Sequence, residues 1–315
     1  MTPSPVLTVT CNPAIDVTYR VDRVRMHEVH RVSAVSRRAG GKGLNVASVL
    51  NLLGHPVTAA GFIGGHLGNE LVDLVPEGVR LAWTRTAVAT RSTTAVVDDG
   101  GVTLYNEPGE DPGSDAWDRL IAQVEELAPD HRVVVVSGSL PPRAPADGLA
   151  RIVEAAHGGG ACCVVDTSGR ALLDAVAAGA DLVKPNREEL LAATSSASCR
   201  EGVRELMRLG ARTVLLSDGE RGMGAYTTAG GSEPVSWVRP ASAVQGNATG
   251  AGDASVAAVA RHLASREDEP DWAEALRDAV ALSAATVLVP TAGDFDRDAY
   301  AEFRRTAVEE HHAPR

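Results

Sequence analysis

From residue 114 onward, hydrophobic positions follow two alternating patterns. Short, continuous apolar runs such as residues 133–136 are typical of strands buried in a parallel sheet. Longer amphipathic stretches between them have the spacing of helices. The expected helices cover residues 114–127, 146–156, 170–178, 200–209, 252–265, 272–288 and 297–308. Strands and helices that alternate in this way predict a mainly parallel sheet with helices on both faces.

The first third of the chain contains more strand-like stretches than a regular alternation of strands and helices explains. Residues 6–10 and 57–63 fit the main sheet, and helices are expected at 44–53 and 68–75. Four further extended stretches cover residues 14–21, 29–36, 91–97 and 102–105, and the last two are joined by a hairpin signal, Asp98-Asp99-Gly100-Gly101. We expect the extra strands, from about 14–36 and 91–106, to form a small sheet that acts as a lid.

Composition narrows the classes of function. The 315 residues contain no repeat or low-complexity linker, so one domain is expected to span residues 1–315. The net charge of -11 argues against nucleic acid or an anionic membrane surface as a partner. There is no apolar run of about 18 residues and no secretory signal pattern. Four cysteines without a C-x-x-C pair are typical of buried, reduced thiols, so we expect a cytoplasmic protein.

Lysine is rare enough to be informative. Only Lys42 and Lys184 are lysines among the 30 basic residues; the others are arginine. A coding bias explains the excess of arginine, but it does not explain why both lysines fall in motif-like segments. Because lysine is a compact charge on a flexible stem, a site that needs it rejects arginine. Both lysines are therefore candidate site residues.

A glycine-rich turn precedes the helix expected at 252–265. In Thr249-Gly250-Ala251-Gly252-Asp253, small residues expose backbone N–H groups at a helix start, which favours binding of an anion. Asp253 would repel that anion. It is either a residue that caps the helix or a general base facing a hydroxyl group that attacks a phosphoryl group.

Four further segments have unusual chemistry. Gly40-Gly41-Lys42-Gly43-Leu44-Asn45 also precedes a helix, and Lys42 and Asn45 could hold polar substrate groups. In Lys184-Pro185-Asn186-Arg187-Glu188-Glu189, Asn186 and Glu189 lie on one helix face; they could position hydrated Mg²⁺, form a capping box, or do both. Asp16 follows the first strand and could accept hydrogen bonds from sugar hydroxyls. Ser139 follows the all-valine strand and could donate to a phosphate or sugar.

These five segments, in this order, resemble the ribokinase-like carbohydrate kinases of the PfkB family over about residues 6–305. The most specific element is Thr249–Asp253, which is similar to the C-terminal signature of the family. Gly40–Ala47 is similar to its N-terminal signature, and the remaining segments are most similar to the hexose-phosphate branch, which includes 1-phosphofructokinase and tagatose-6-phosphate kinase. The resemblance implies a three-layer α/β/α fold with a mainly parallel sheet and a small β-sheet lid.

The resemblance also implies a role for each candidate. Asp253 would be the catalytic base, with an anion hole formed by Gly250, Ala251 and Gly252. The sugar would be bound by Asp16, Gly40, Gly41 and Asn45, and its phosphate by Lys42, Arg91 and Ser139, with Arg31 added from a neighbouring subunit. ATP would be bound by Lys184, Asn186, Ser217, Gly219, Gly222 and Thr249, and Mg²⁺ by Asn186 and Glu189 through water.

The implied activity is ATP-dependent phosphorylation of a sugar phosphate, with fructose 1-phosphate favoured and fructose 1,6-bisphosphate as product. Ser92 and Thr93 replace the Asn and Lys that fructose-1-phosphate kinases often carry after the arginine, so tagatose-6-phosphate or 6-phosphofructokinase activity stays open. A kinase for an unphosphorylated sugar or nucleoside is disfavoured because such a substrate does not need both Lys42 and Arg91. A non-catalytic sugar-phosphate sensor is disfavoured by the intact Asp253. A lid sheet with an exposed face favours a homodimer.

Overall fold

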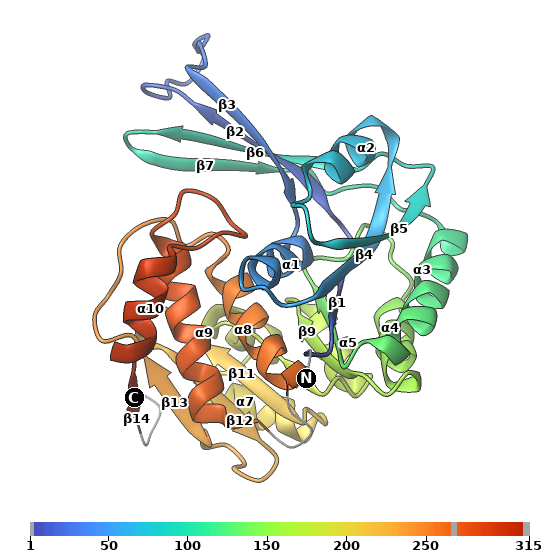
Figure 1. Ribbon diagram of the computed structural model, residues 1–315, viewed down its shortest axis with the longest axis vertical. Helices are drawn as coiled ribbons and strands as arrows, with labels where there is room; N and C mark the ends of the chain where they lie inside the picture. The colour runs from blue at the N-terminus through green and yellow to red at the C-terminus, as the bar shows by residue number, and fades with distance from the viewer. Residues whose placement is uncertain (1–2, 266–269, 311–315) are drawn as a thin grey trace.

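The computed structural model describes residues 3–265 and 270–310, and within them a ten-stranded sheet forms the centre of the molecule (Figure 1). The strand order is β14-β13-β12-β11-β10-β9-β8-β1-β4-β5. Strands β11 to β5 along this order are parallel, and β12, β13 and β14 are antiparallel additions at one edge. The bounds are β1 (Val6–Thr10), β4 (Val57–Gly64), β5 (Arg80–Thr86), β8 (Val133–Ser137), β9 (Cys162–Asp166), β10 (Leu182–Val183), β11 (Thr213–Ser217), β12 (Met223–Thr227), β13 (Ser236–Arg239) and β14 (Val308–Glu310).

Helices cover both faces of this sheet, which gives the expected three layers. The bounds are α1 (Lys42–Leu52), α2 (Gly65–Leu74), α3 (Ser114–Leu127), α4 (Gly148–Gly158), α5 (Arg170–Ala177), α6 (Arg187–Thr194), α7 (Cys199–Arg208), α8 (Ala251–Ser265), α9 (Trp272–Val287) and α10 (Arg297–Thr306). Along β8, Val133 and Val135 pack into one core, whereas Val134 and Val136 pack into the other. The continuous valine run therefore supplies both faces, as expected of a buried parallel strand.

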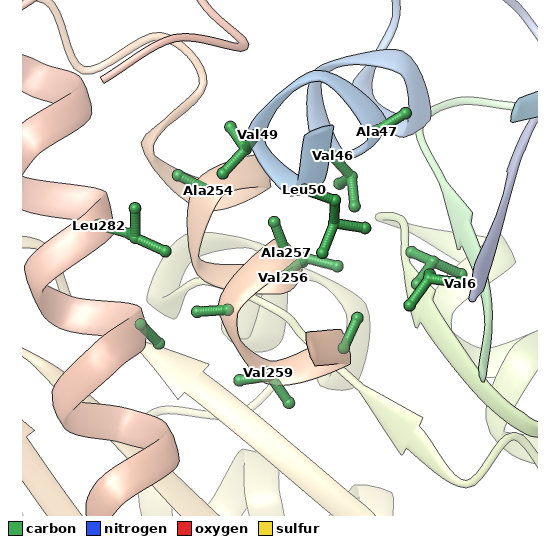
Figure 2. Close-up of a cluster of buried hydrophobic side chains, with 14 of the residues drawn as sticks. Val6, Val46, Ala47, Val49, Leu50, Ala254, Val256, Ala257, Val259 and Leu282 are labelled. Atoms are coloured by element: carbon green, nitrogen blue, oxygen red, sulfur yellow. The ribbon is translucent and has the colours of Figure 1, made fainter. Parts of the chain in front are cut away.

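The first core lies between the sheet and helices α1, α8 and α9. Figure 2 shows Val46 and Leu50 of α1 near Val256 of α8, with Leu282 of α9 on the other side of α8. Small residues at Ala254 and Ala257 let α8 pack closely among its neighbours, and both side chains are fully buried. This packing fixes the N-terminal ends of α1 and α8, which carry two of the glycine-rich segments.

A second, four-stranded sheet projects from the main body and has the order β3-β2-β6-β7 (Figure 1). We call it the lid; its strands are β2 (Ala14–Arg20), β3 (Ala34–Gly40), β6 (Arg91–Asp98) and β7 (Gly101–Asn106). The expectation of a strand at residues 29–36 was wrong in its bounds. Arg20 at the end of β2 pairs with Ala34, so residues 29–33 lie beyond the last residue of their partner strand.

Two other strands escaped the sequence pattern. Strand β5 lies at the edge of the main sheet, where mixed exposure removes any clear alternation. Strand β14 pairs with β13 in a stretch that was partly assigned to the last helix, which ends at Thr306. No helix among the described residues is long and apolar enough to cross a membrane. The cytoplasmic location stays a prediction.

Candidate active site

The candidate residues follow the carboxyl ends of parallel strands that lie next to one another. Ser137, Asp166, Lys184 and Ser217 lie at or just after the ends of β8, β9, β10 and β11. Because parallel strands end at one edge, their last residues lie together at the edge where ligands usually bind in open α/β sheets. The starts of α1 and α8 add Lys42, Asn45 and Asp253 to the same region, which the contacts below establish.

Asp253 lies in the first turn of α8 and is 5% exposed. The amide Nδ2 of Asn45 donates a hydrogen bond of 2.7 Å to Asp253 Oδ2. Burial and the nearby negative charge of Asp166 raise the pKa of Asp253 to about 7, although Lys42, Asn45 and Lys184 act in the opposite direction. A carboxylate with this pKa is poised to accept a proton near neutral pH.

The turn before Asp253 has the backbone geometry that requires glycine. Gly250 has φ +86°, and a Cβ there would lie 2.7 Å from Cβ of Ala292. Gly252 approaches Lys184, whose Nζ would lie 3.5 Å from a Cβ on that residue. The N–H of Ala251 donates to the carbonyl of Ala248 at 3.2 Å, so it is already engaged in a turn.

Both lysines of the chain converge on one buried carboxylate that the sequence analysis did not select. Lys42 Nζ lies 3.5 Å from Asp166 Oδ2, and Lys184 Nζ lies 3.4 Å from Asp166 Oδ1. Burial alone would raise the pKa of Asp166, but Lys184 and Lys42 hold it below its ordinary value. Asp166 follows four apolar residues at the end of β9, and a carboxylate in that position is the signal that could have identified it.

Asp16 lies at the base of the lid, next to Gly40. A Cβ on Gly40 would lie 2.2 Å from Cγ of Asp16, so only glycine leaves room for this carboxylate. Thr93 Oγ1 donates a hydrogen bond of 2.5 Å to Asp16 Oδ1, a contact that the sequence analysis also missed. Burial raises the pKa of Asp16, while Thr93, Arg91 and Arg38 oppose the rise. Gly41 has φ +115° and precedes α1.

Arg91 and Ser139 lie together against Asn12. The Arg91 guanidinium donates to the carbonyl of Asn12 at 3.2 and 3.1 Å and to that of Glu107 at 3.0 Å. Asn12 Nδ2 donates to Ser139 Oγ at 3.4 Å. Arg31 is exposed in the segment that joins β2 to β3, at the end of the lid opposite to Gly40. The phosphate-binding roles of Arg91, Ser139 and Arg31 stay predictions.

A capping box is present at the start of α6. Asn186 Oδ1 accepts the Glu189 N–H at 2.8 Å, and Glu189 Oε2 accepts the Asn186 N–H at 2.9 Å. Glu189 Oε1 takes no part in this box and lies 4.0 Å from Lys42 Nζ. No group of three or more His, Cys, Asp or Glu residues among the described ones could hold a metal. Mg²⁺ that arrives with substrate phosphates usually keeps several waters, and its binding through water by Asn186 and Glu189 stays a prediction.

The candidate nucleotide turn lies beside this helix start. Ser217 forms a parallel bridge with Asn186. Gly219 and Gly222 have φ +56° and +99°, and a Cβ on Gly222 would lie 2.1 Å from the carbonyl oxygen of Val238. Thr249 is exposed, and its N–H donates to Asn247 Oδ1 at 3.1 Å. The geometry brings Ser217 next to the Lys184–Asn186 segment and leaves the binding of ATP by these residues as a prediction.

The chain is similar to known proteins over almost its whole length. The family model described as pfkB family carbohydrate kinase matches residues 6–298. The tetrameric inhibited form of phosphofructokinase-2 from Escherichia coli is 29% identical, with a TM-score of 0.86 over 96% of this chain and 98% of that chain. A possible 1-phosphofructokinase from Thermotoga maritima (22% identity, TM-score 0.85, 97% and 99% covered) and a ribokinase from Arabidopsis thaliana complexed with ribose and ATP (19%, 0.71, 97% and 99%) share the fold.

The fold is therefore ribokinase-like, with a large, mostly parallel sheet and a smaller separate sheet. The family match covers almost the whole chain and includes every candidate residue from Asp16 to Asp253. The chain belongs to the PfkB family of carbohydrate kinases.

Proposed function

We propose that this carbohydrate kinase transfers the terminal phosphoryl group of ATP to a sugar phosphate, with fructose 1-phosphate as the favoured acceptor. The observation that carries the proposal is the buried Asp253 carboxylate, whose pKa is raised to about 7, in a cluster with the two lysines of the chain. A neutral sugar does not need this concentration of positive charge. A sugar phosphate and ATP together bring several negative charges, which Lys42 and Lys184 would balance.

In the proposed reaction, Asp253 accepts the proton of the acceptor hydroxyl as that oxygen attacks the terminal phosphorus of ATP. Asn45 holds the carboxylate through its hydrogen bond to Oδ2, which fixes the direction of Oδ1. The bond from phosphorus to the bridging oxygen breaks, and ADP leaves. Because the transition state of phosphoryl transfer is loose, positioning and charge stabilisation supply most of the catalysis.

The residues would divide between the two substrates. Lys184 would contact ATP phosphates, with the turn from Ser217 to Gly222 beside it, while Asp16 would accept hydrogen bonds from sugar hydroxyls and Lys42 would bind the sugar's phosphate. When bound, Mg²⁺ neutralises charge on the phosphates of ATP. Asn186 and Glu189 would hold it through water.

A coupled assay of ADP release tests the proposal. Purified protein is supplied with ATP, Mg²⁺ and, separately, fructose 1-phosphate, fructose 6-phosphate, tagatose 6-phosphate, fructose and ribose. We expect the highest kcat/KM with a sugar phosphate and specifically with fructose 1-phosphate. Higher kcat/KM with fructose 6-phosphate, the ligand in a 28% identical phosphofructokinase-2 structure, would change the proposed substrate. No ADP release with any acceptor would favour the sensor alternative.

The lid supports a second part of the proposal, a homodimer. Val35, Val102, Leu104 and Tyr105 on lid strands are each more than half exposed. By the register of the lid, Val102 and Leu104 share one face, and Val35 and Tyr105 share the other. Apolar side chains on an exposed sheet are an unfavourable surface for a monomer, and a second copy packed on the face with Leu104 would cover Val102 and Leu104. Sedimentation of the wild type and of a Leu104→Lys variant tests this: the wild type should sediment as a dimer and the variant as a monomer.

A further inference from the structure

Asp166 is shared between two cations that belong to different sides of the cleft. Its carboxylate is buried at the end of β9, and each oxygen faces one lysine: Oδ1 faces Lys184 at 3.4 Å and Oδ2 faces Lys42 at 3.5 Å. Ser137 Oγ also donates to Oδ2, at 3.2 Å. One rigid planar group therefore sets the separation of two flexible side chains.

The sheet holds this carboxylate in place. Ser137 and Asp166 are partners in the parallel register of β8 and β9, so the serine that orients the carboxylate comes from the adjacent strand. Lys42 begins α1, directly after the base of lid strand β3, whereas Lys184 follows β10 and precedes the α6 cap. A charge fixed by two central strands thus connects the lid side to the nucleotide side.

The distances leave both lysines able to bind substrate. Separations of 3.4 and 3.5 Å are longer than a strong charge-assisted hydrogen bond of about 2.8 Å. An ammonium group has three donors, so each lysine retains donors for phosphate oxygens. Lys184 is almost fully buried and would be left without its partner if the carboxylate were neutral.

We propose that Asp166 is a positioning residue that holds Lys42 and Lys184 in one arrangement and thereby couples binding of the sugar phosphate to binding of ATP. This inference rests on the proposed function for its second half only. A ligand that moves either ammonium group changes the balance of charge on the shared carboxylate, and the other ammonium group responds. Coupling of this kind between sites is typically 5–150-fold in affinity.

The scarcity of lysine allows a direct test without activity. Protein labelled with ¹³C and ¹⁵N only in lysine has two side-chain signals to follow, from Lys42 and Lys184, because the chain contains no other lysine. We expect Asp166→Asn to shift both signals in the free protein. Ser137→Ala keeps the carboxylate and removes one hydrogen bond, so it should shift both less. A change in only one lysine signal in both variants would overturn the shared arrangement.

Titration with a non-hydrolysable ATP analogue tests the coupling. In the wild type, the analogue should shift the signals of both lysines and increase the affinity for the sugar phosphate. In Asp166→Asn, the Lys184 signal should still respond to the analogue and the Lys42 signal should not. The affinity of this variant for the sugar phosphate should be nearly the same with and without the analogue. If both lysines respond equally in the variant, the coupling is wrong. If the wild type has no kinase activity, the proposed function is wrong. The NMR test of the lysine arrangement in the free protein would still stand.

The pH profile separates positioning from a purely structural role. Asp253 is faced by Asp166 from β9, by Lys42 and Asn45 from α1, and by Lys184 after β10. Because Asp166 raises the pKa of Asp253 and the lysines lower it, Asp166→Asn should move the acidic limb of kcat/KM to lower pH. An unmoved limb, or a variant whose only defect is a higher Mg²⁺ requirement, would overturn the proposal.

Discussion

Replacement of Asp253 by Asn should increase stability while it abolishes most of the activity. The pKa of Asp253 rises from 3.8 to about 7 in the folded chain. The folded state therefore binds this proton more tightly than the unfolded state does, and ionisation of the group opposes folding as the pH rises from about 4 to 7. The shift of about three pKa units corresponds to about 4 kcal/mol above pH 7, and to about 1.5 kcal/mol at pH 5.

Asparagine carries no charge at either pH and keeps an oxygen that can accept from Asn45 Nδ2. We expect denaturant unfolding at pH 8 to give a larger free energy for Asp253→Asn than for the wild type, by up to about 4 kcal/mol, and the gain to shrink at pH 5. In the ADP-release assay, kcat should fall by about 10²–10⁴-fold, which is the usual contribution of a positioned base. For the wild type, kcat/KM should fall about tenfold per unit below pH 7.

Asp278→Asn is the matched control. Asp278 is also buried, but His262, Arg261 and Tyr300 hold its pKa below the ordinary value despite the burial. Its charge therefore stabilises the folded state above the unfolded pKa, and this stabilisation is lost as the pH falls. The Asn variant should be less stable than the wild type at pH 8. A destabilised Asp253→Asn variant, or one with near-normal turnover, would refute the assignment of Asp253 as a general base whose ionisation destabilises the folded state.

Three further variants test the proposed contacts with the sugar phosphate and with Mg²⁺. Gly40→Ala should raise KM for the sugar phosphate by at least an order of magnitude and leave KM for ATP unchanged, because the new Cβ would lie 2.2 Å from Cγ of Asp16. Equal KM values for the sugar phosphate in wild type and variant would contradict this. Lys42→Ala should raise KM for the sugar phosphate far more than KM for ATP, and equal effects would move Lys42 out of the sugar-phosphate site. Glu189→Gln keeps an oxygen that can accept the Asn186 N–H, so the melting temperature should stay within a few degrees while the Mg²⁺ concentration for half-maximal rate rises; a lower melting temperature with unchanged Mg²⁺ dependence would leave only the capping role.

The sequence predicted the main layers well because buried strands and amphipathic helices have strong local patterns. The continuous apolar run at residues 133–136 was predicted to be a strand of a buried parallel sheet, and the structure places its side chains in both cores. The bounds of the third lid strand were wrong because they depend on pairing: Ala34 begins the strand where Arg20 ends its partner. An edge strand such as β5 has no distinctive pattern, since part of each face is exposed.

Sequence reasoning found the glycines and lysines of the candidate site but not the groups that orient them. Thr93 belongs to a strand, and its side chain becomes informative only when the register brings Asp16 beside it. Asp166 carried a sequence signal at the end of its strand, but its partner Ser137 is known only from the register of β8 and β9. The capping box at Asn186 was an open alternative, and the structure shows that it forms. It does so without using Glu189 Oε1, which leaves the metal-binding alternative available.

The lid is attached to the body at the end that carries Asp16, the proposed sugar-binding carboxylate. Ala14 pairs with both Gly40 and Arg91, and Asp16 pairs with Thr93 only two residues further along. A stiff sheet that swings about its root displaces the root least and the tip most. Substitutions near the tip, apart from Arg31, can therefore alter the proposed contact between two copies while leaving the proposed sugar contact at Asp16 in place. The contact between two copies and the choice of sugar can accordingly change independently of each other within this architecture.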